Sequence, residues 1–315
     1  MSKSNLPAYI SFALVILLFP LVVTNEYFLA VMIFVGIHVL VALGLTLLIG
    51  FAGQLSLCQA AFYGIGAYTT GVLSAKFGMN PWISIVLAIL LACCLAFVLG
   101  LPALKLRGHY LAMATLGFGE IINIVFKEWG DLTGGPSGLV GIPRLSLGSI
   151  SLDTDLRYFL FVWLVVLLVI AFLLNLTNSR VGRALLALKR SEDAAAAVGV
   201  PVAMYKIKVF MLCAALASLG GSFYAHYVTV ISPESFDVFF SIVVVTMVVA
   251  GGLTSVWGAV IGASLFTILP EVLQAFEDYS IVIYGFILLF ILMFMPQGIA
   301  GIVGVCTDRL KRPFS

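Results

Sequence analysis

Long runs of apolar residues recur along almost the whole chain, separated by short polar segments. Most runs can cross about 30 Å of hydrocarbon as a helix, which rises about 1.5 Å per residue. The runs do not alternate between apolar and polar positions, which excludes a membrane β-barrel, and open sheet cannot face lipid. The pattern predicts about ten spanning helices, with eight or nine as alternatives, near residues 8–24, 27–49, 55–75, 81–104, 109–127, 158–176, 206–230, 237–252, 256–271 and 280–300.

Composition supports this interpretation. Hydrophobic residues make up 63% of the chain and charged residues 10%, with a mean hydropathy of +1.20. Soluble domains carry about 25% charged residues. We therefore predict an all-α integral membrane protein, a polytopic helical bundle of about eight to ten transmembrane helices that forms a single membrane domain over residues 1–315.

Two of the predicted spans, near residues 55–75 and 237–271, are interrupted by glycines and small polar residues. The segments GFAGQLSLCQAAFYGIGAY (Gly50–Tyr68) and AGGLTSVWGAVIGASLF (Ala250–Phe266) share a Gly-x-x-Ser step and a later Gly-Ala pair, a weak similarity consistent with an inverted repeat of broken helices. Such breaks line the solute path in transporters, but small residues also permit close helix packing, and both interpretations stay open. The first makes path candidates of Gly53, Gln54, Ser56, Gln59, Gly251, Gly252, Thr254 and Ser255.

Glu120 is the only acid placed away from the ends of a predicted span, in LGFGEII beside Gly117 and Gly119. Ionisable groups within hydrocarbon are costly and usually functional. A Glu120 side chain facing the bundle interior would line a solute path or brace a broken helix, so Gly117, Gly119 and Glu120 are also path candidates. A structural hydrogen bond to a neighbouring helix explains Glu120 equally well.

Charge predicts the orientation of the bundle. When the loops alternate between the two sides, one side receives twelve of the Lys and Arg residues and the other receives four, Lys76, Lys127, Arg144 and Arg157. Basic residues concentrate on the cytoplasmic side of membrane proteins. Both termini and the segment 178–208, which holds six of the twelve, are therefore expected in the cytoplasm, and the loop 128–157 on the opposite side.

The segment NSRVGRALLALKRSEDAAAAVGVPVAMYKIK (residues 178–208) predicts two short helices between spans. Ser191 is a good N-cap, Glu192 and Asp193 suit the first helical turn, and four alanines follow. Gly199 suits the C′ position, and a helical piece over Arg183–Arg190 precedes. A loop needed only for orientation would not require capped helices, although basic residues that merely fix topology remain the alternative. The outer loop has its own signature, DLTGGPSGLVGIP (Asp131–Pro143), whose glycines predict tight turns with positive φ.

The sequence motifs of several enzyme and binding classes are absent. The sequence has no Gly-x-x-x-x-Gly-Lys-Ser/Thr loop, no nucleophile triad and no His-Glu-x-x-His, which disfavours an intramembrane enzyme and gives no catalytic residues. The five cysteines lack metal-ligand spacing, so no metal site is predicted, and no basic run with aromatics indicates nucleic acid. Few charges within spans favour an apolar or zwitterionic solute. An ion-coupled secondary transporter that uses Glu120 remains an alternative.

Specific stretches narrow the class by resemblance. SEDAAAAVGV is similar to the coupling loop of bacterial ABC importer permeases. GQLSLCQAAFYGIGAY, LKLRGHYLAMATLGFGEIINIVF and LTGGPSGLVGIP, in this order, resemble the branched-chain amino acid ABC permeases of the LivM type over roughly residues 30–300. The resemblance implies a permease subunit of an importer in the bacterial inner membrane, with 178–208 as cytoplasmic coupling loop and 128–157 as periplasmic loop.

The resemblance also implies partners. These are two ATPase subunits, a second LivH-like permease in a heterodimer (a homodimer is less favoured), a periplasmic substrate-binding protein and the lipid bilayer. ATP would be used by the partners, with no cofactor bound by this chain. Urea, short amides or another amino acid are alternative cargoes. By the same resemblance, the residues that meet the ATPase are Arg183, Ser191, Glu192, Asp193, Ala194, Ala195, Ala196, Ala197 and Gly199, with Glu192, Ala194, Ala195 and Gly199 at the core of that contact.

Overall fold

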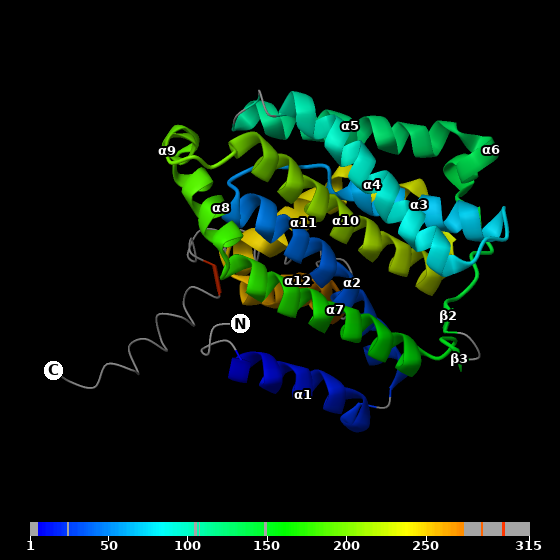
Figure 1. Cartoon of the computed structure of the whole chain (residues 1–315). Coiled ribbons are helices and arrows are strands. Elements are labelled where there is room, and N and C mark those ends of the chain that lie inside the picture. The colour runs from blue at the N-terminus through cyan, green and yellow to red at the C-terminus, as the bar shows by residue number, and fades with distance from the viewer. Residues whose placement is uncertain are drawn as a thin grey trace.

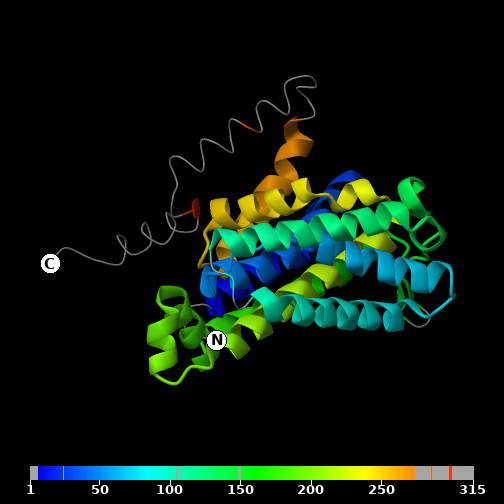
Figure 2. The ribbon, with the colours of Figure 1, turned by 90° about the horizontal axis from the view of Figure 1, so that it is seen from above.

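A computed structural model describes residues 6–23, 25–103, 106, 108–147, 150–273, 285 and 298–299 as a helical bundle (Figures 1 and 2). Its helices are α1 (Leu6–Val22), α2 (Glu26–Leu45), α3 (Gln59–Ala75), α4 (Pro81–Ala103), α5 (His109–Glu128), α6 (Gly130–Thr133), α7 (Asp155–Thr177), α8 (Arg180–Arg190), α9 (Glu192–Ala197), α10 (Val202–Val228), α11 (Val238–Gly251) and α12 (Val256–Leu273). The short elements are the π-helix η1 (Thr46–Phe51), the 3₁₀ turns η2 (Gly135–Ser137) and η3 (Pro233–Phe236), and the strands β1 (Leu139–Val140), β2 (Ser146–Leu147), β3 (Ile150–Ser151) and β4 (Val230–Ile231).

Six described helical segments are long and apolar enough to cross a membrane: α2 with η1, α4, α5, α7, α10 and α12. The helices α1 and α11 are shorter but apolar, and α3 follows an extended segment. Each of the first nine predicted spans thus coincides with a helix. The tenth, residues 280–300, lies outside the described part of the chain apart from residues 285, 298 and 299. The all-α prediction is confirmed.

The helix α2 is the centre of the bundle. It packs against α10, α7, α12 and α11, and 72% of its most apolar window is buried inside the chain, against 28% for α5. Its apolar side chains are covered by these neighbours instead of by lipid, and Ile33, Ile37 and Leu40 are fully buried. The helix α5 instead leaves much of its surface uncovered by this chain.

Small residues let the backbones of α3 and α10 touch. A Cβ added to Gly66 would lie 2.1 Å from the carbonyl oxygen of Ser218, and one added to Gly221 would lie 1.8 Å from that of Tyr63. The hydroxyl of Ser222 in α10 donates to the Gly66 carbonyl of α3 at 3.3 Å. Association of helices within lipid depends on such close packing, because apolar burial gives no driving force there.

The outer loop 128–157 is joined to the bundle by strands and hydrogen bonds. β1 pairs antiparallel with β4, and Gly134, Gly135, Gly138 and Gly141 all have positive φ, which confirms the turns predicted from the sequence. The imidazole of His226 contacts Thr70 Oγ1 at 2.9 Å and the Pro143 carbonyl at 2.6 Å, so it holds the loop to α3 and α10. The helices α8 and α9 lie at the opposite end of the bundle from α6, β2 and β3 (Figure 1).

We expect Gly221→Ala to destabilise the bundle, because the new methyl group would overlap the Tyr63 backbone. Overpacking of this kind costs about 1–3 kcal/mol, so the thermal unfolding midpoint of the detergent-purified protein should fall by several degrees. The matched control is Gly117→Ala in α5, where an added Cβ meets nothing within 4 Å. Equal midpoints for the two variants would contradict the backbone contact between α3 and α10.

Candidate functional site

The helices α8 and α9 form a capped unit, here called the α8–α9 hairpin (Ser179–Val200). The Ser179 hydroxyl accepts from the Val181 N–H, and the Ser191 hydroxyl accepts from the Ala194 N–H. At the other end Gly199, with φ +84°, donates to the Ala196 carbonyl and Val200 donates to the Ala195 carbonyl. This pair of bonds is a Schellman motif. The predicted caps of α9 are confirmed, and α8 begins three residues earlier than expected because Ser179 supplies its cap.

The hairpin exposes only part of the set expected to meet a partner. Arg183, Ser191, Asp193, Ala194, Ala196, Ala197 and Gly199 are exposed. Ala195, however, is 2% exposed, so its side chain does not project from the hairpin. Its place at the core of the ATPase contact stays a prediction. Glu192 is half-buried and forms an ion pair with Lys206 of α10, so its carboxylate is directed at the bundle. A short helix packed on its own chain must bury one face, and these two residues lie on it.

A groove of about 390 Å³ runs along the hairpin. It is lined by Arg183, Leu186, Ala187, Arg190, Ser191, Ala194, Ala195 and Val198. Its wall includes Val198, which is 77% exposed, and Ala195 forms part of its floor. An apolar groove with two guanidinium groups in its lining can accept a partner segment that combines apolar and acidic side chains.

Both predicted helix breaks are present, and they touch each other. The first runs from the π-helical turn η1 through an extended segment to Cys58, and the second separates α11 from α12 at residues 252–255. A Cβ added to Gly50 would lie 1.6 Å from the Leu253 carbonyl oxygen. The Lys189 ammonium of α8 donates to the Gly50 carbonyl at 2.8 Å. The hairpin and the two breaks therefore meet at one place, here called the break junction (Gly50, Lys189 and Leu253).

The path candidates of the first break are mostly enclosed by the chain. Gln54, Ser56 and Gln59 are buried and Gly53 is exposed. The Gln59 amide donates to Cys213 Sγ at 3.2 Å, whereas Gln54 Oε1 and Gln59 Oε1 accept no hydrogen bond from the described residues. Unpaired buried amide oxygens are costly and are available to a ligand or a partner group.

The candidates of the second break are less enclosed. Gly251 and Gly252 are buried, Ser255 is half-buried and Thr254 is exposed. The Ser255 hydroxyl accepts from the Gly258 N–H at 3.1 Å, which caps the first turn of α12. Gly252 has φ +125°, a backbone conformation that side chains rarely adopt.

Glu120 does not face the interior of this chain. It is exposed on α5, so the expectation of an inward Glu120 is wrong for the single chain. Gly117 has open space beside it, whereas a Cβ added to Gly119 would lie 3.6 Å from the Leu57 carbonyl oxygen. The helix α5 thus turns Gly119 inward and Glu120 outward. Because a carboxylate cannot face hydrocarbon cheaply, the outward face of α5 needs water or another chain beside it.

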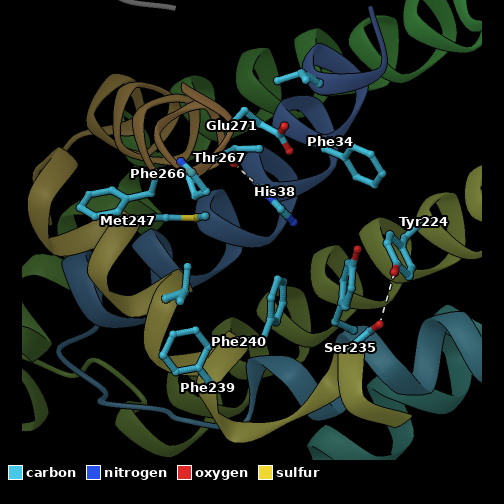
Figure 3. A pocket seen from close by; sticks show the side chains of 14 residues that line it. Phe34, His38, Tyr224, Ser235, Phe239, Phe240, Met247, Phe266, Thr267 and Glu271 are labelled. Atoms are coloured by element: carbon cyan, nitrogen blue, oxygen red, sulfur yellow. Dashed lines mark hydrogen bonds between the residues drawn. The ribbon is translucent and has the colours of Figure 1, made fainter. Parts of the chain in front are cut away.

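A separate cavity of about 700 Å³ lies between α2, α10, α11 and α12 (Figure 3). It is lined by Val31, Phe34, His38, Tyr63, Tyr224, Ser235, Phe239, Phe240, Val243, Met247, Phe266, Thr267, Pro270 and Glu271. The side chains of Phe34, Phe240 and Tyr224 surround it in Figure 3. None of the path candidates predicted from the sequence is in its lining.

Polar groups occupy a few places in the cavity wall. His38 Nδ1 and Thr267 Oγ1 are 2.8 Å apart, and the Tyr224 hydroxyl donates to Ser235 Oγ at 3.4 Å. The Glu271 carboxylate accepts from the Tyr27 hydroxyl. Chemically the cavity suits an apolar side chain with a small number of hydrogen-bonding groups. The sequence analysis missed it because its residues come from helices far apart in the chain and form no motif.

Lys206 was also missed as a site residue. It is 4% exposed, in the first turns of α10. Its position at the edge of a predicted span gave it the appearance of one more topology charge. The signal in the sequence was a lysine at the edge of an apolar span, because lysine is almost never fully buried unless it is paired. The pattern does not identify the partner, because Glu192 lies fourteen residues earlier and at no helical spacing.

Comparison with known proteins identifies the family to which the chain belongs. Residues 27–292 match the family model described as branched-chain amino acid transport system, permease component. The chain is 34% identical to the high-affinity branched-chain amino acid transport system permease protein LivM of Escherichia coli, over 84% of this chain and 67% of that protein. It is 25% identical to a probable LivM of Methanocaldococcus jannaschii, over 90% and 95%.

Further relatives carry the LivH name. The LivH permease protein of Escherichia coli is 25% identical, over 84% of this chain and 91% of that protein. No solved structure matches the chain. The extent of the family match and the identity to LivM agree with the multi-pass helical bundle. The chain therefore belongs to the family of permease components of branched-chain amino acid transport systems.

Proposed function

We propose that the chain is the membrane-spanning permease subunit of an ABC importer that carries branched-chain or related hydrophobic amino acids into the cytoplasm. The observation that carries this proposal is the α8–α9 hairpin. It is capped at both helices, presents a groove, and is tied to the break junction inside the bundle. A loop that only fixes orientation needs none of these features, whereas a device that passes force between two proteins needs all of them.

The energy source is a pair of separate ATPase subunits. The sequence lacks a phosphate-binding loop of its own, so hydrolysis belongs to a partner and the chain is a transporter subunit rather than an enzyme. The hairpin docks on an ATPase at its own end of the bundle, through the groove whose lining includes Arg183 and Arg190. By the positive-inside rule this end, with both chain termini, is cytoplasmic, and the membrane is the bacterial inner membrane.

A second, LivH-like permease chain completes the membrane part. The outward face of α5 supports this, because Glu120 and the open space at Gly117 lie on a helix that this chain leaves largely uncovered. A partner permease there would remove the carboxylate from lipid and enclose a polar path between the two chains. A periplasmic substrate-binding protein delivers cargo at the end formed by α6, β1 and β4.

The cargo follows from the family and from the chemistry of the cavity. Relatives are named for branched-chain amino acids, and the cavity of Figure 3 is lined mostly by aromatic and aliphatic side chains. Urea and short amides, the alternative cargoes, offer no apolar side chain to such a surface. Uptake of labelled leucine, challenged with excess isoleucine, valine, urea or acetamide, distinguishes them: competition by the amides alone would overturn the amino acid assignment.

The decisive experiment is purification of the tagged chain from its native membrane in mild detergent, followed by mass spectrometry. We expect a phosphate-loop ATPase and a second permease to co-purify. ATP-driven uptake should then persist in proteoliposomes when ion gradients are collapsed. Recovery of the chain alone, with uptake driven by an ion gradient, would instead establish an ion-coupled secondary transporter.

We predict that Val198→Asp weakens ATPase binding at least about tenfold, since a charge forced into an apolar contact costs more than ~1.4 kcal/mol. Val198 lines the groove and is exposed, so its replacement leaves the fold intact. The matched control is Ala203→Asp, which adds the same charge to an exposed position at the start of α10, outside the groove lining and outside the residues expected to meet the ATPase. Retention of ATPase on the immobilised permease is the measurement; equal retention by both variants would contradict docking through the groove.

We expect Glu120→Gln to reduce uptake severalfold while the complex assembles normally. The substitution keeps the shape of the side chain and removes the charge that the outward face of α5 presents. Initial uptake rates and co-purification yields, measured on the same preparations, separate transport from assembly. Unchanged uptake would make Glu120 structural, and loss of the second permease from the complex would make it an assembly residue.

A further inference from the structure

From the contacts of the hairpin we infer that Lys189 and Lys206 are positioning residues that carry its movement into the membrane bundle. Lys189 connects α8 to the break junction, and Lys206 connects α9 to α10. This inference rests on the proposed function, because it assumes that an ATPase moves the hairpin.

Lys189 completes the hydrogen bonding of an interrupted helix. The π-helical turn ends at Phe51, and the Gln54 N–H donates to the Leu48 carbonyl rather than to Gly50. The Gly50 carbonyl is instead reached by the Lys189 ammonium at 2.8 Å. Gly50 is buried, and a buried backbone carbonyl requires a hydrogen-bond partner. The charge-assisted bond from α8 therefore stabilises this particular conformation of the break.

The same lysine fits closely against the extended segment. A Cβ on Gly53 would lie 3.1 Å from Lys189 Cγ, and Gly53 has φ +69°. Gly50 also packs on the backbone of the second break, where an added Cβ would lie 1.6 Å from the Leu253 carbonyl oxygen. A shift of α8 cannot occur without displacing either the Lys189 bond or both breaks. Packed interfaces of this kind change between discrete arrangements instead of deforming continuously.

Lys206 makes the second connection. Its ammonium pairs with the Glu192 carboxylate of α9, and the side chain is 5% exposed. It lines a small cleft with Gln54, Ser56 and Phe210. A buried ammonium that loses its partner is strongly unfavourable, so α9 and the start of α10 must move together. The cleft also brings α10 into contact with the first break.

Other basic residues of the segment lack these connections. Arg180 and Lys208 are exposed, and neither side chain makes a hydrogen bond or ion pair with the described residues. They lie on α8 and α10, the helices that carry Lys189 and Lys206. Comparison of a Lys189 variant with an Arg180 variant, and of a Lys206 variant with a Lys208 variant, therefore distinguishes a specific connection from a general effect of positive charge.

The test uses the complete transporter complex in proteoliposomes and measures ATP hydrolysed and amino acid taken up in the same vesicles. We expect Lys189→Met and Lys206→Met to retain both ATPase subunits and their hydrolysis, while uptake per ATP falls about fivefold or more, as for a lost allosteric coupling. Arg180→Met and Lys208→Met should match the wild type. Unchanged uptake per ATP in both lysine variants would overturn the inference.

Two further measurements keep a folding defect from imitating this result. The exchanged pair Glu192→Lys with Lys206→Glu should recover uptake per ATP that either single substitution loses, since it restores the ion pair in reverse. Lys189→Met should keep the wild-type unfolding midpoint within a few degrees. Loss of ATPase subunits from the lysine variants would assign the residues to docking and overturn transmission. If the proposed function itself were wrong, no ATPase would accompany the wild-type chain, which distinguishes that outcome from failure of this inference alone.

Discussion

The structure depends on the requirement that every backbone N–H and C=O at membrane depth has a hydrogen-bond partner. Continuous helices satisfy it without help, and α4, α7 and α10 are of that kind. Within the described part of the chain, helical continuity is broken at η1 with its extended continuation and at residues 252–255. Both breaks are enclosed by protein: Gly50 packs on Leu253, and the Gly50 carbonyl accepts from Lys189.

That enclosure explains why the bundle has its particular arrangement. The helix α2 must be central because η1 continues directly from it into the break junction. The backbone contact of Gly66 and Gly221 brings α10 against α3, the helix that follows the extended segment. Glycine is required at these positions because any side chain would hold the two backbones apart. Within lipid, the helices associate through such close packing and not through a hydrophobic force.

The hairpin acquires its role from the same constraint. A surface loop could satisfy its own polar groups in water, but α8 gives one ammonium to the broken helix and α9 gives one carboxylate to α10. A partner that moves the hairpin would therefore move groups on which the internal hydrogen bonding of the bundle depends. This links an event outside the membrane to conformations within it through few and identifiable atoms.

The sequence by itself determined the class of protein, nine of the helices expected to span the membrane, both glycine breaks and the caps of α9, because each follows from local properties: apolar length, glycine content and capping chemistry. Quoted motifs also gave the family. Only the tertiary structure decided that Ala195 faces inward, that Glu120 faces outward, that Glu192 pairs with Lys206, and that Gly50 meets Leu253. These facts depend on which face of a helix is covered and on contacts between residues far apart in the chain, and neither has a local pattern to reveal it.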